Sequence, residues 1–97
     1  MDNILAKMNP FSIDKNPTDI LKELAQRTRT LRKEDKMSQS ELAQRANVSL
    51  GSYKRFESSG HISLDSLLKI AFILGKLDDF ETIFQSSKNK NLEKLFK

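Results

Sequence analysis

Hydrophobic residues recur every three or four positions through the middle of this chain, a spacing typical of amphipathic helices. A first helix is expected after Asn16-Pro17, a cap followed by a proline suited to the first helical position. Its inward stripe is expected to be Leu21, Leu24, Thr28 and Leu31. Further helices are expected after Ser38 and after Ser49, because a serine hydroxyl can accept a bond from an orphan N–H at a helix start.

Two more helices are expected towards the C-terminus. The fourth begins after Ser63 and ends at Gly75, because glycine readily adopts the left-handed backbone of a helix end. Its buried face is expected to comprise Leu64, Leu67, Leu68, Ile70, Ala71 and Leu74. The fifth is short, and Asp78 and Glu81 have the spacing of a capping box at its start. Its apolar residues either complete the monomer core, form a dimer surface, or do both; they are Leu77, Phe80, Ile83 and Phe84.

The stretch from Ser38 to Glu57 combines two of these helices with a tight turn. Ser38 and Glu41 have the spacing of a capping box. Asn47 tolerates left-handed backbone better than most residues, and Val48 is expected to fill the turn. In the second helix Tyr53 and Phe56 are expected to face inward, which leaves Leu50, Gly51, Lys54 and Arg55 on the outer face.

This stretch resembles the helix-turn-helix of the phage repressor and Cro superfamily, the Xre-type regulators. Their pattern runs S/T-Q-x-E-L-A-x-x-x-G-V-S, followed by a recognition helix that ends in an apolar residue and Glu. The matching residues are Ser38, Gln39, Glu41, Leu42, Ala43, Val48, Ser49, Phe56 and Glu57, while Asn47 stands where Gly is usual. The resemblance extends from about Leu21 to about Phe84. It implies an all-α, five-helix, lambda-repressor-like DNA-binding domain.

The resemblance also implies roles for individual side chains. Those expected to face base pairs are Gln39, Leu50, Gly51, Lys54 and Arg55, with Arg55 the best candidate for a two-bonded contact to guanine. Candidate phosphate contacts are Ser49, Ser52, Ser59 and Arg29, although Arg29 could equally serve the helix dipole. Arg32 is expected to pair with Glu57 and so to lock the first helix to the third. The loop expected from Glu57 to His61 should lie near the DNA backbone.

A narrower resemblance, over Ser49 to Phe84, is to small Xre regulators encoded beside Hip-type kinase toxins. Those regulators act as antitoxins and repress their own operons, which implies a kinase toxin as a protein partner. A phage-type repressor or a restriction-modification controller protein would share the same features. Repressors of this type commonly bind palindromic double-stranded DNA as homodimers. The alternative from another class is a helical protein-interaction module that uses Phe80, Phe84 and Leu95.

Composition and charge narrow the function only slightly. The net charge of +4 and pI near 9.5 weakly favour binding to a polyanion. The lack of cysteine rules out disulfides and thiolate metal sites, and it suits a cytoplasmic protein. No apolar run approaches the roughly 20 residues of a membrane span. The sequence shows no paired carboxylates, metal-ligand spacing or nucleophile–base pair, so we expect neither an enzyme nor a cofactor.

At 97 residues the chain has room for one domain. We expect an N-terminal arm over residues 1–16, a DNA-binding domain over 17–85 and a C-terminal tail over 86–97. The arm is expected either to be flexible or to order against a partner subunit. His61 is the only histidine and is expected to be solvated rather than functional.

Overall fold

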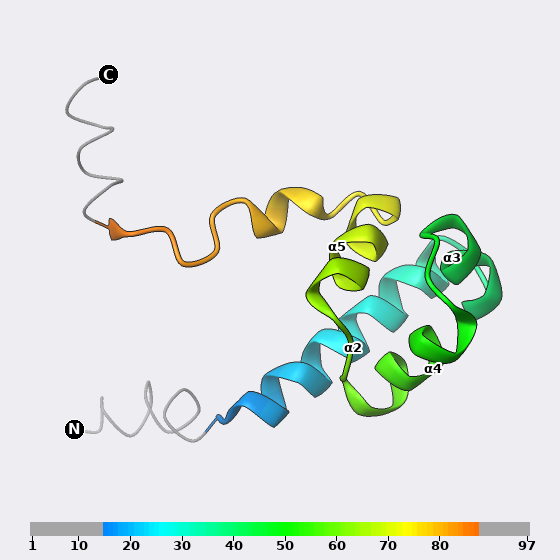
Figure 1. The fold of residues 1–97 in the computed structure, drawn as a ribbon, viewed down its shortest axis with the longest axis horizontal. Coiled ribbons are helices and arrows are strands. Elements are labelled where there is room, and N and C mark those ends of the chain that lie inside the picture. Colours follow the sequence, from blue (N-terminus) through cyan, green and yellow to red (C-terminus); the bar gives the residue numbers. More distant parts are fainter. Residues whose placement is uncertain (1–14, 88–97) are drawn as a thin grey trace.

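The computed structural model describes residues 15–87, which form four α-helices and one turn of 3-10 helix (Figure 1). The α-helices are α2 (Pro17–Glu34), α3 (Gln39–Arg45), α4 (Leu50–Ser59) and α5 (Leu64–Ile73). The 3-10 turn η1 (Leu77–Phe80) follows them. The all-α class is thus confirmed over the described residues, and none of their helices is long and apolar enough to cross a membrane. The arm and tail expected at the two ends lie almost wholly outside the described range.

The four α-helices start at the residues that the sequence predicts. The side-chain oxygens of Asn16, Ser38, Ser49 and Ser63 each accept a hydrogen bond from the backbone N–H three residues on. One detail of the prediction is wrong. The capping box of Ser38 and Glu41 is only half formed, because the Glu41 carboxylate accepts a bond from Arg45 at 2.7 Å instead.

Left-handed residues end these helices. Asn47 has φ 58°, and the turn after α3 is closed by bonds from the Asn47 N–H to the Gln44 carbonyl and from the Val48 N–H to the Ala43 carbonyl. Gly75 ends α5 in the same conformation, with φ 73°. Both predictions are confirmed. Asparagine can replace the usual glycine at position 47, because residues with a short polar side chain adopt left-handed backbone more readily than others.

The end of α4 differs from the prediction. Residues 57–59, expected in a loop, continue the helix, and the left-handed turn falls at Gly60 with φ 87°. A Cβ at Gly60 would lie only 2.8 Å from backbone and side-chain atoms of Leu21. Glycine is therefore required there both for its backbone conformation and for the close approach of α2.

The core lies where α2, α3, α4 and α5 meet. Its largest fully buried side chains are Tyr53, Phe56, Leu42 and Ile70, so the inward orientation predicted for the two aromatic residues is confirmed. Thr28 is buried in the α2 stripe, where its hydroxyl donates to the Leu24 carbonyl at 2.8 Å. This bond removes the cost of burying an unpaired hydroxyl.

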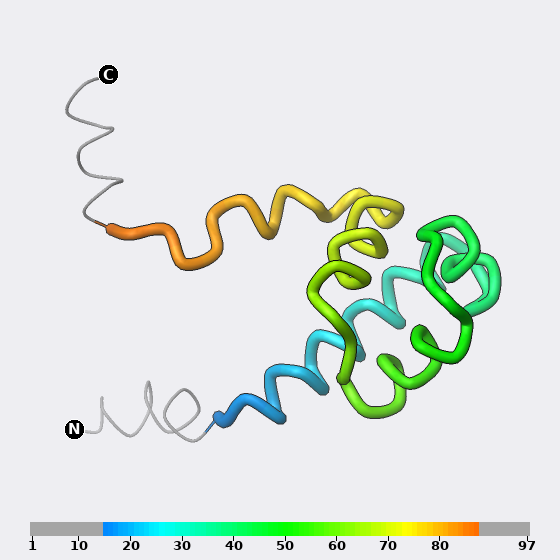
Figure 2. Tube along the Cα trace, viewed as in Figure 1, coloured from blue at the N-terminus to red at the C-terminus, as the bar shows by residue number. Residues whose placement is uncertain are grey.

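The segment after α5 departs most from the prediction. In place of a fifth α-helix there is only η1, which has no side-chain cap, so the capping box expected at Asp78 and Glu81 is wrong. Turns follow, and Phe84 adopts φ 64°, which interrupts any helix. A helix this short is unstable unless its apolar face is packed. Figure 2 shows the tube running from α5 away from the rest of the bundle.

Leu64 was also expected in the buried face of α5, and this prediction is wrong. Its exposed fraction is 65%. As the first residue of α5 it lies at the edge of the bundle, where the helical spacing continues but no neighbouring helix covers it. The remaining predicted positions of that face are buried or half-buried.

Candidate nucleic-acid interface

The outer face of α4 presents the side chains expected to read DNA. Leu50, Gly51, Lys54 and Arg55 are all exposed. On the opposite face Tyr53 and Phe56 are completely buried, and their rings meet edge to face with centroids 6.2 Å apart. The outward residues thus project from a helix that is fixed to the core on its other side.

The carboxylate of Glu57 joins three helices. Arg32 donates from Nε and Nη2 to its two oxygens at 2.8 and 3.2 Å, and Gln39 donates from Nε2 at 2.9 Å. The Tyr53 hydroxyl also donates to it. Arg32 uses its remaining nitrogen, Nη1, to bond the Met37 carbonyl at 2.8 Å. The side chains of Arg32 and Glu57 are 9% and 6% exposed, so the expected ion pair is present and buried.

The electrostatics of this network keep its charges fixed at neutral pH. Burial alone raises the pKa of the Glu57 carboxyl, but hydrogen bonds from Arg32, Tyr53 and Gln39 outweigh it and hold the pKa below its usual value. The hydrogen bond to Glu57 raises the pKa of Arg32. Burial, with help from Glu57, raises the pKa of Tyr53, whose hydroxyl therefore stays a proton donor. An ionised Glu57 thus ties α2 and the start of α3 to α4.

Gln39 lies partly inside this network rather than wholly on the outer surface. Its amide nitrogen donates one N–H to Glu57, so the carbonyl oxygen and the second N–H remain to bind another molecule. Gln39 also lines a shallow hollow of about 500 Å³ together with Arg29 from α2 and Lys54 from α4. The structure therefore brings together three of the residues that the sequence assigned to DNA.

The serines predicted to contact phosphate form two different sets of hydrogen bonds. The Ser49 hydroxyl accepts from the Ser52 N–H and donates to the Ser52 hydroxyl at 2.8 Å, so the pair stays at the start of α4. The Ser59 hydroxyl instead donates to the Arg55 carbonyl at 2.7 Å and accepts from the His61 N–H at 3.2 Å. Its proton is therefore already engaged, which makes Ser59 a weaker candidate for binding phosphate than Ser52.

A second hollow, of about 360 Å³, lies between α4 and the start of α5. Arg55 and Ser52 line it beside His61, Ser63 and Ser66. Ser63 and Ser66 were not predicted to belong to the interface. Their caps and spacing mark only the start of a helix, and no linear pattern shows that this start lies next to the outer face of α4.

Comparison with known proteins agrees with this geometry. A family model described as Helix-turn-helix (HTH_3) matches residues 29–80, more than half of the chain. The chain belongs to the Xre-type helix-turn-helix family. This is a family of DNA-binding domains found in transcriptional regulators. No curated protein and no solved structure gives a match.

The helix-turn-helix match includes α3, the turn and α4, and so every residue that the sequence assigned to DNA contact. It ends at residue 80, so Ile83 and Phe84 lie beyond it. The exposed aromatic ring of Phe84 therefore lies outside the matched region.

Proposed function

We propose that the protein is a sequence-specific transcriptional repressor that binds a palindromic operator as a homodimer in the cytoplasm. The observation that carries this proposal is the exposed face of α4, with Lys54 and Arg55, held rigidly by the buried Glu57 network. A preorganised helix of this kind fits the major groove, where side chains read base edges. The basic net charge supports binding to a polyanion.

Each residue on this face has a separate role in the proposal. Arg55 makes a two-bonded contact to guanine, and Leu50 packs on a thymine methyl group. Gly51 allows close approach, and a Cβ built there meets nothing within 4 Å in its own chain. Lys54 and the side-chain amide of Gln39 add polar contacts to bases. The phosphate contacts are assigned to Arg29, Ser49, Ser52 and Ser59.

The test is Arg55→Ala, after an operator has been selected from a pool of random duplexes. The variant should lose about 1–3 kcal/mol of binding free energy on the selected duplex and accept other bases at one position. Arg45→Ala is the control, because Arg45 is an exposed arginine of α3 that pairs with Glu41. Equal losses on selected and scrambled duplexes would make Arg55 a phosphate contact. Binding without the steep salt dependence of phosphate neutralisation would instead favour a protein-interaction module.

The homodimer is assigned to the C-terminal end of the described chain. Leu77, Ile83 and Phe84 are 38%, 49% and 100% exposed there, and Phe80 is half-buried beside them. These four residues form the proposed dimer interface, which would place two recognition helices about 34 Å apart or at a multiple of that spacing. Phe84→Glu should give a folded monomer that loses the advantage of a full operator over a half operator. Sedimentation and duplex titration measure the two effects.

The finer proposal is that the protein is the autoregulatory antitoxin of a Hip-type toxin–antitoxin operon. Its support is the resemblance over residues 49–84 to regulators encoded beside kinase toxins. The neighbouring reading frame provides the test, followed by co-purification with the kinase that it encodes. If no kinase gene adjoins, the antitoxin role is lost, and a phage-type repressor or a restriction-modification controller protein takes its place.

A further inference from the structure

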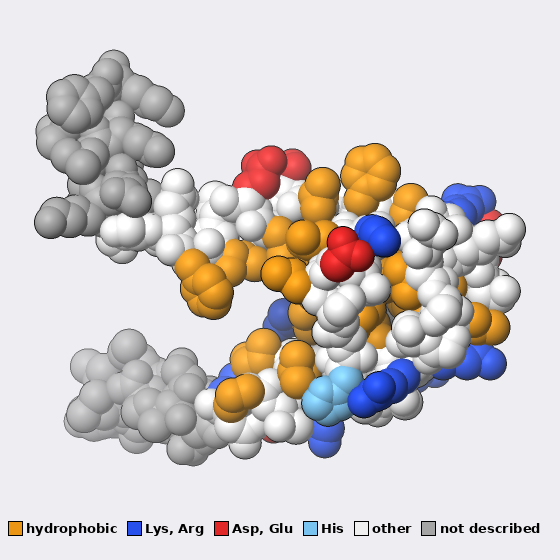
Figure 3. Space-filling view, in the orientation of Figure 1, with side chains coloured by type: hydrophobic (Ala, Val, Ile, Leu, Met, Phe, Trp, Pro, Cys, Tyr) orange, Lys and Arg blue, Asp and Glu red, His pale blue; other side chains and the backbone are white. Residues whose placement is uncertain are grey.

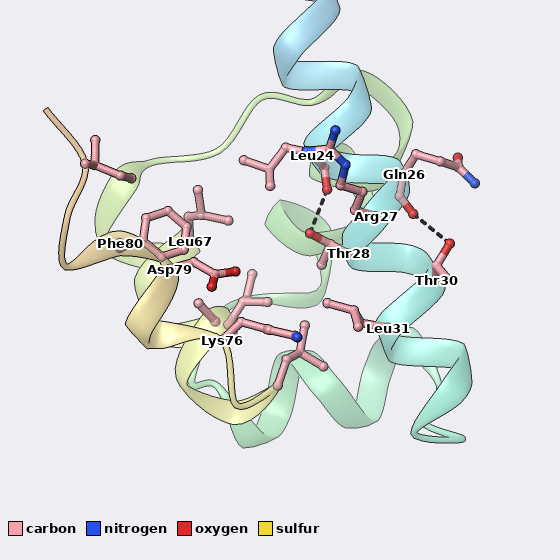
Figure 4. A pocket seen from close by; sticks show the side chains of 14 residues that line it. Leu24, Gln26, Arg27, Thr28, Thr30, Leu31, Leu67, Lys76, Asp79 and Phe80 are labelled. Carbon is pink, nitrogen blue, oxygen red and sulfur yellow. Dashed lines mark hydrogen bonds between the residues drawn. The ribbon is translucent and has the colours of Figure 1, made fainter.

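A groove of about 620 Å³ opens between α2 and the segment that follows α5 (Figure 4). Leu24, Thr28 and Leu31 line it from α2, and Leu67 and Phe80 face them from the other side. In Figure 3 hydrophobic atoms flank both sides of this hollow. Among the described residues, the edge of the hydrophobic core is open to water at this groove. Covering such apolar surface is favourable.

Phe84 is the complementary feature. Its side chain is fully exposed, and its backbone adopts φ 64°, a conformation that is rare for residues other than glycine and the short polar residues. Its neighbour Ile83 lines the groove of the same chain, whereas Phe84 does not. The left-handed turn therefore directs an aromatic ring away from this groove of its own chain. Within residues 15–87, each chain thus carries both an open apolar groove and an unburied apolar ring.

Charge indicates what fills the groove. Its lining includes two cationic side chains, Lys76 and Arg27, and one acidic side chain, Asp79, so its net charge is positive. The Arg27 side chain is 71% exposed and lies 3.5 Å from Glu23. The segment that leads to Phe84 is acidic, with Asp78, Asp79 and Glu81. A second copy of this chain brings that acidic segment towards the basic rim of the first copy. In a two-fold dimer the same contact forms twice.

We infer that the dimer is reciprocal: Phe84 of each copy inserts into the groove between α2 and the C-terminal segment of the other copy. The inference rests on the homodimer proposed above and specifies its contacts. It differs from a dimer in which the two apolar patches simply meet face to face. In the reciprocal dimer the nearest neighbours of Phe84 come from α2 and α5 of the other copy, not from a second Phe84.

Cysteine mapping separates these arrangements, because the natural chain has no cysteine. Arg27→Cys places a thiol on the groove rim and leaves Lys76 there as a positive charge. Gln85→Cys places a thiol next to Phe84, which stays intact. The two variants, one carrying a mass tag, are mixed and oxidised mildly. Gln44→Cys, at an exposed site on α3, replaces Arg27→Cys in the control. Because thiols within one complex react at roughly mM effective concentration, the 27–85 disulfide should exceed the 44–85 product at least tenfold.

Three results would overturn the inference. An 85–85 disulfide without the mixed product would show that the two patches meet face to face. A monomer in which Arg27→Cys and Gln85→Cys, combined in one chain, close an internal disulfide would show that Phe84 covers its own groove. A natural protein that sediments as a monomer at every concentration would remove the dimer itself. DNA reading by α4 would be unaffected by that last result, since the Arg55→Ala titration tests it separately.

A second measurement uses Phe84→Ala without any cysteine. It should raise the dimer dissociation constant about tenfold or more, because a central aromatic anchor carries much of an interface's free energy. Ile20→Ala is the matched control, since Ile20 is an exposed apolar residue of α2 that does not line the groove. Equal dissociation constants for the two variants would contradict insertion of Phe84.

Discussion

The α3–α4 half of the molecule and the segment after α5 differ in how far their aromatic side chains are buried. Tyr53 and Phe56 are completely buried, and the polar groups around them are bonded to one another. Phe84 is completely exposed, and the nearby η1 has no side-chain cap. The half that carries the proposed DNA-reading surface is therefore complete within one chain. The C-terminal end leaves apolar surface that a second molecule can cover.

The same backbone conformation also has opposite consequences in the two regions. Asn47 and Phe84 have nearly the same φ, 58° and 64°. At Asn47 the left-handed turn brings Val48 into the core and lets two backbone N–H groups bond the end of α3. At Phe84 it leaves the ring in solvent. The turn at Asn47 therefore buries a side chain and closes two backbone bonds, whereas the turn at Phe84 closes one, from the Gln85 N–H to the Thr82 carbonyl at 3.1 Å, and leaves its side chain exposed.

The largest expected effect contrasts two phenylalanines. Phe56→Ala should lower the free energy of unfolding by about 3–5 kcal/mol, because it removes a fully buried ring and leaves a cavity. Phe84→Ala should change it by less than about 0.5 kcal/mol in dilute monomer, because the ring buries nothing there. Urea denaturation at several protein concentrations measures both. A large loss for Phe84→Ala at the lowest concentration would show that its ring is buried within the monomer.

The second prediction contrasts two glutamates. Glu57→Ala should cost about 3 kcal/mol or more, because it strands the buried guanidinium of Arg32. Glu41→Ala, which breaks the exposed pair with Arg45, should cost less than about 1 kcal/mol. Thermal and urea unfolding compare the two variants. Similar losses would mean that water reaches the Arg32–Glu57 pair and that α4 is held mainly by its aromatic residues.

Local sequence signals predicted the helix-turn-helix well. Caps such as Ser49, left-handed positions such as Asn47 and inward residues such as Phe56 depend on chemistry within a few residues of each site. The pairing of Arg32 with Glu57 spans 25 positions, and only the family resemblance pointed to it. The involvement of Gln39 and Tyr53 in the same network was not predicted, because periodicity shows which face a residue occupies but not which polar group it meets there.

The C-terminal segment could not be predicted by the same signals. Phe80, Ile83 and Phe84 have helical spacing, and Asp78 with Glu81 mimics a helix start. Whether such a short segment becomes a helix depends on what its apolar face packs against. That packing is decided by tertiary or intermolecular contacts, which the local pattern does not contain. Helical spacing was therefore a sound guide for α2 to α5 and a misleading one after Gly75.

The third prediction contrasts two left-handed glycines, one in each region. Gly75→Ala should cost about 1 kcal/mol, because a Cβ there meets nothing within 4 Å and only the backbone conformation is strained. Gly60→Ala should cost about 1–3 kcal/mol more, because its Cβ would overlap Leu21 of α2. Urea midpoints measure the difference. Equal costs would indicate that α2 shifts freely away from α4, which would contradict a rigidly held recognition helix.

The smallest expected effect is a change in how stability depends on acid. The folded pKa of Glu57 lies below its unfolded value of about 4.3, so the natural protein keeps this contribution above that pH and loses it as the pH falls through the folded pKa. Glu57→Gln should be less stable near pH 7, since Arg32 then lacks its carboxylate, but its stability should fall less between pH 5 and 3. Glu41→Gln, which alters only the exposed pair with Arg45, is the control variant. Urea unfolding at stepped pH gives the three curves. Parallel curves of unfolding free energy against pH for Glu57→Gln and the natural protein would contradict this prediction. The acid sensitivity would then arise from other carboxylates, and the Glu57 network would stabilise the α4 region without setting its response to pH.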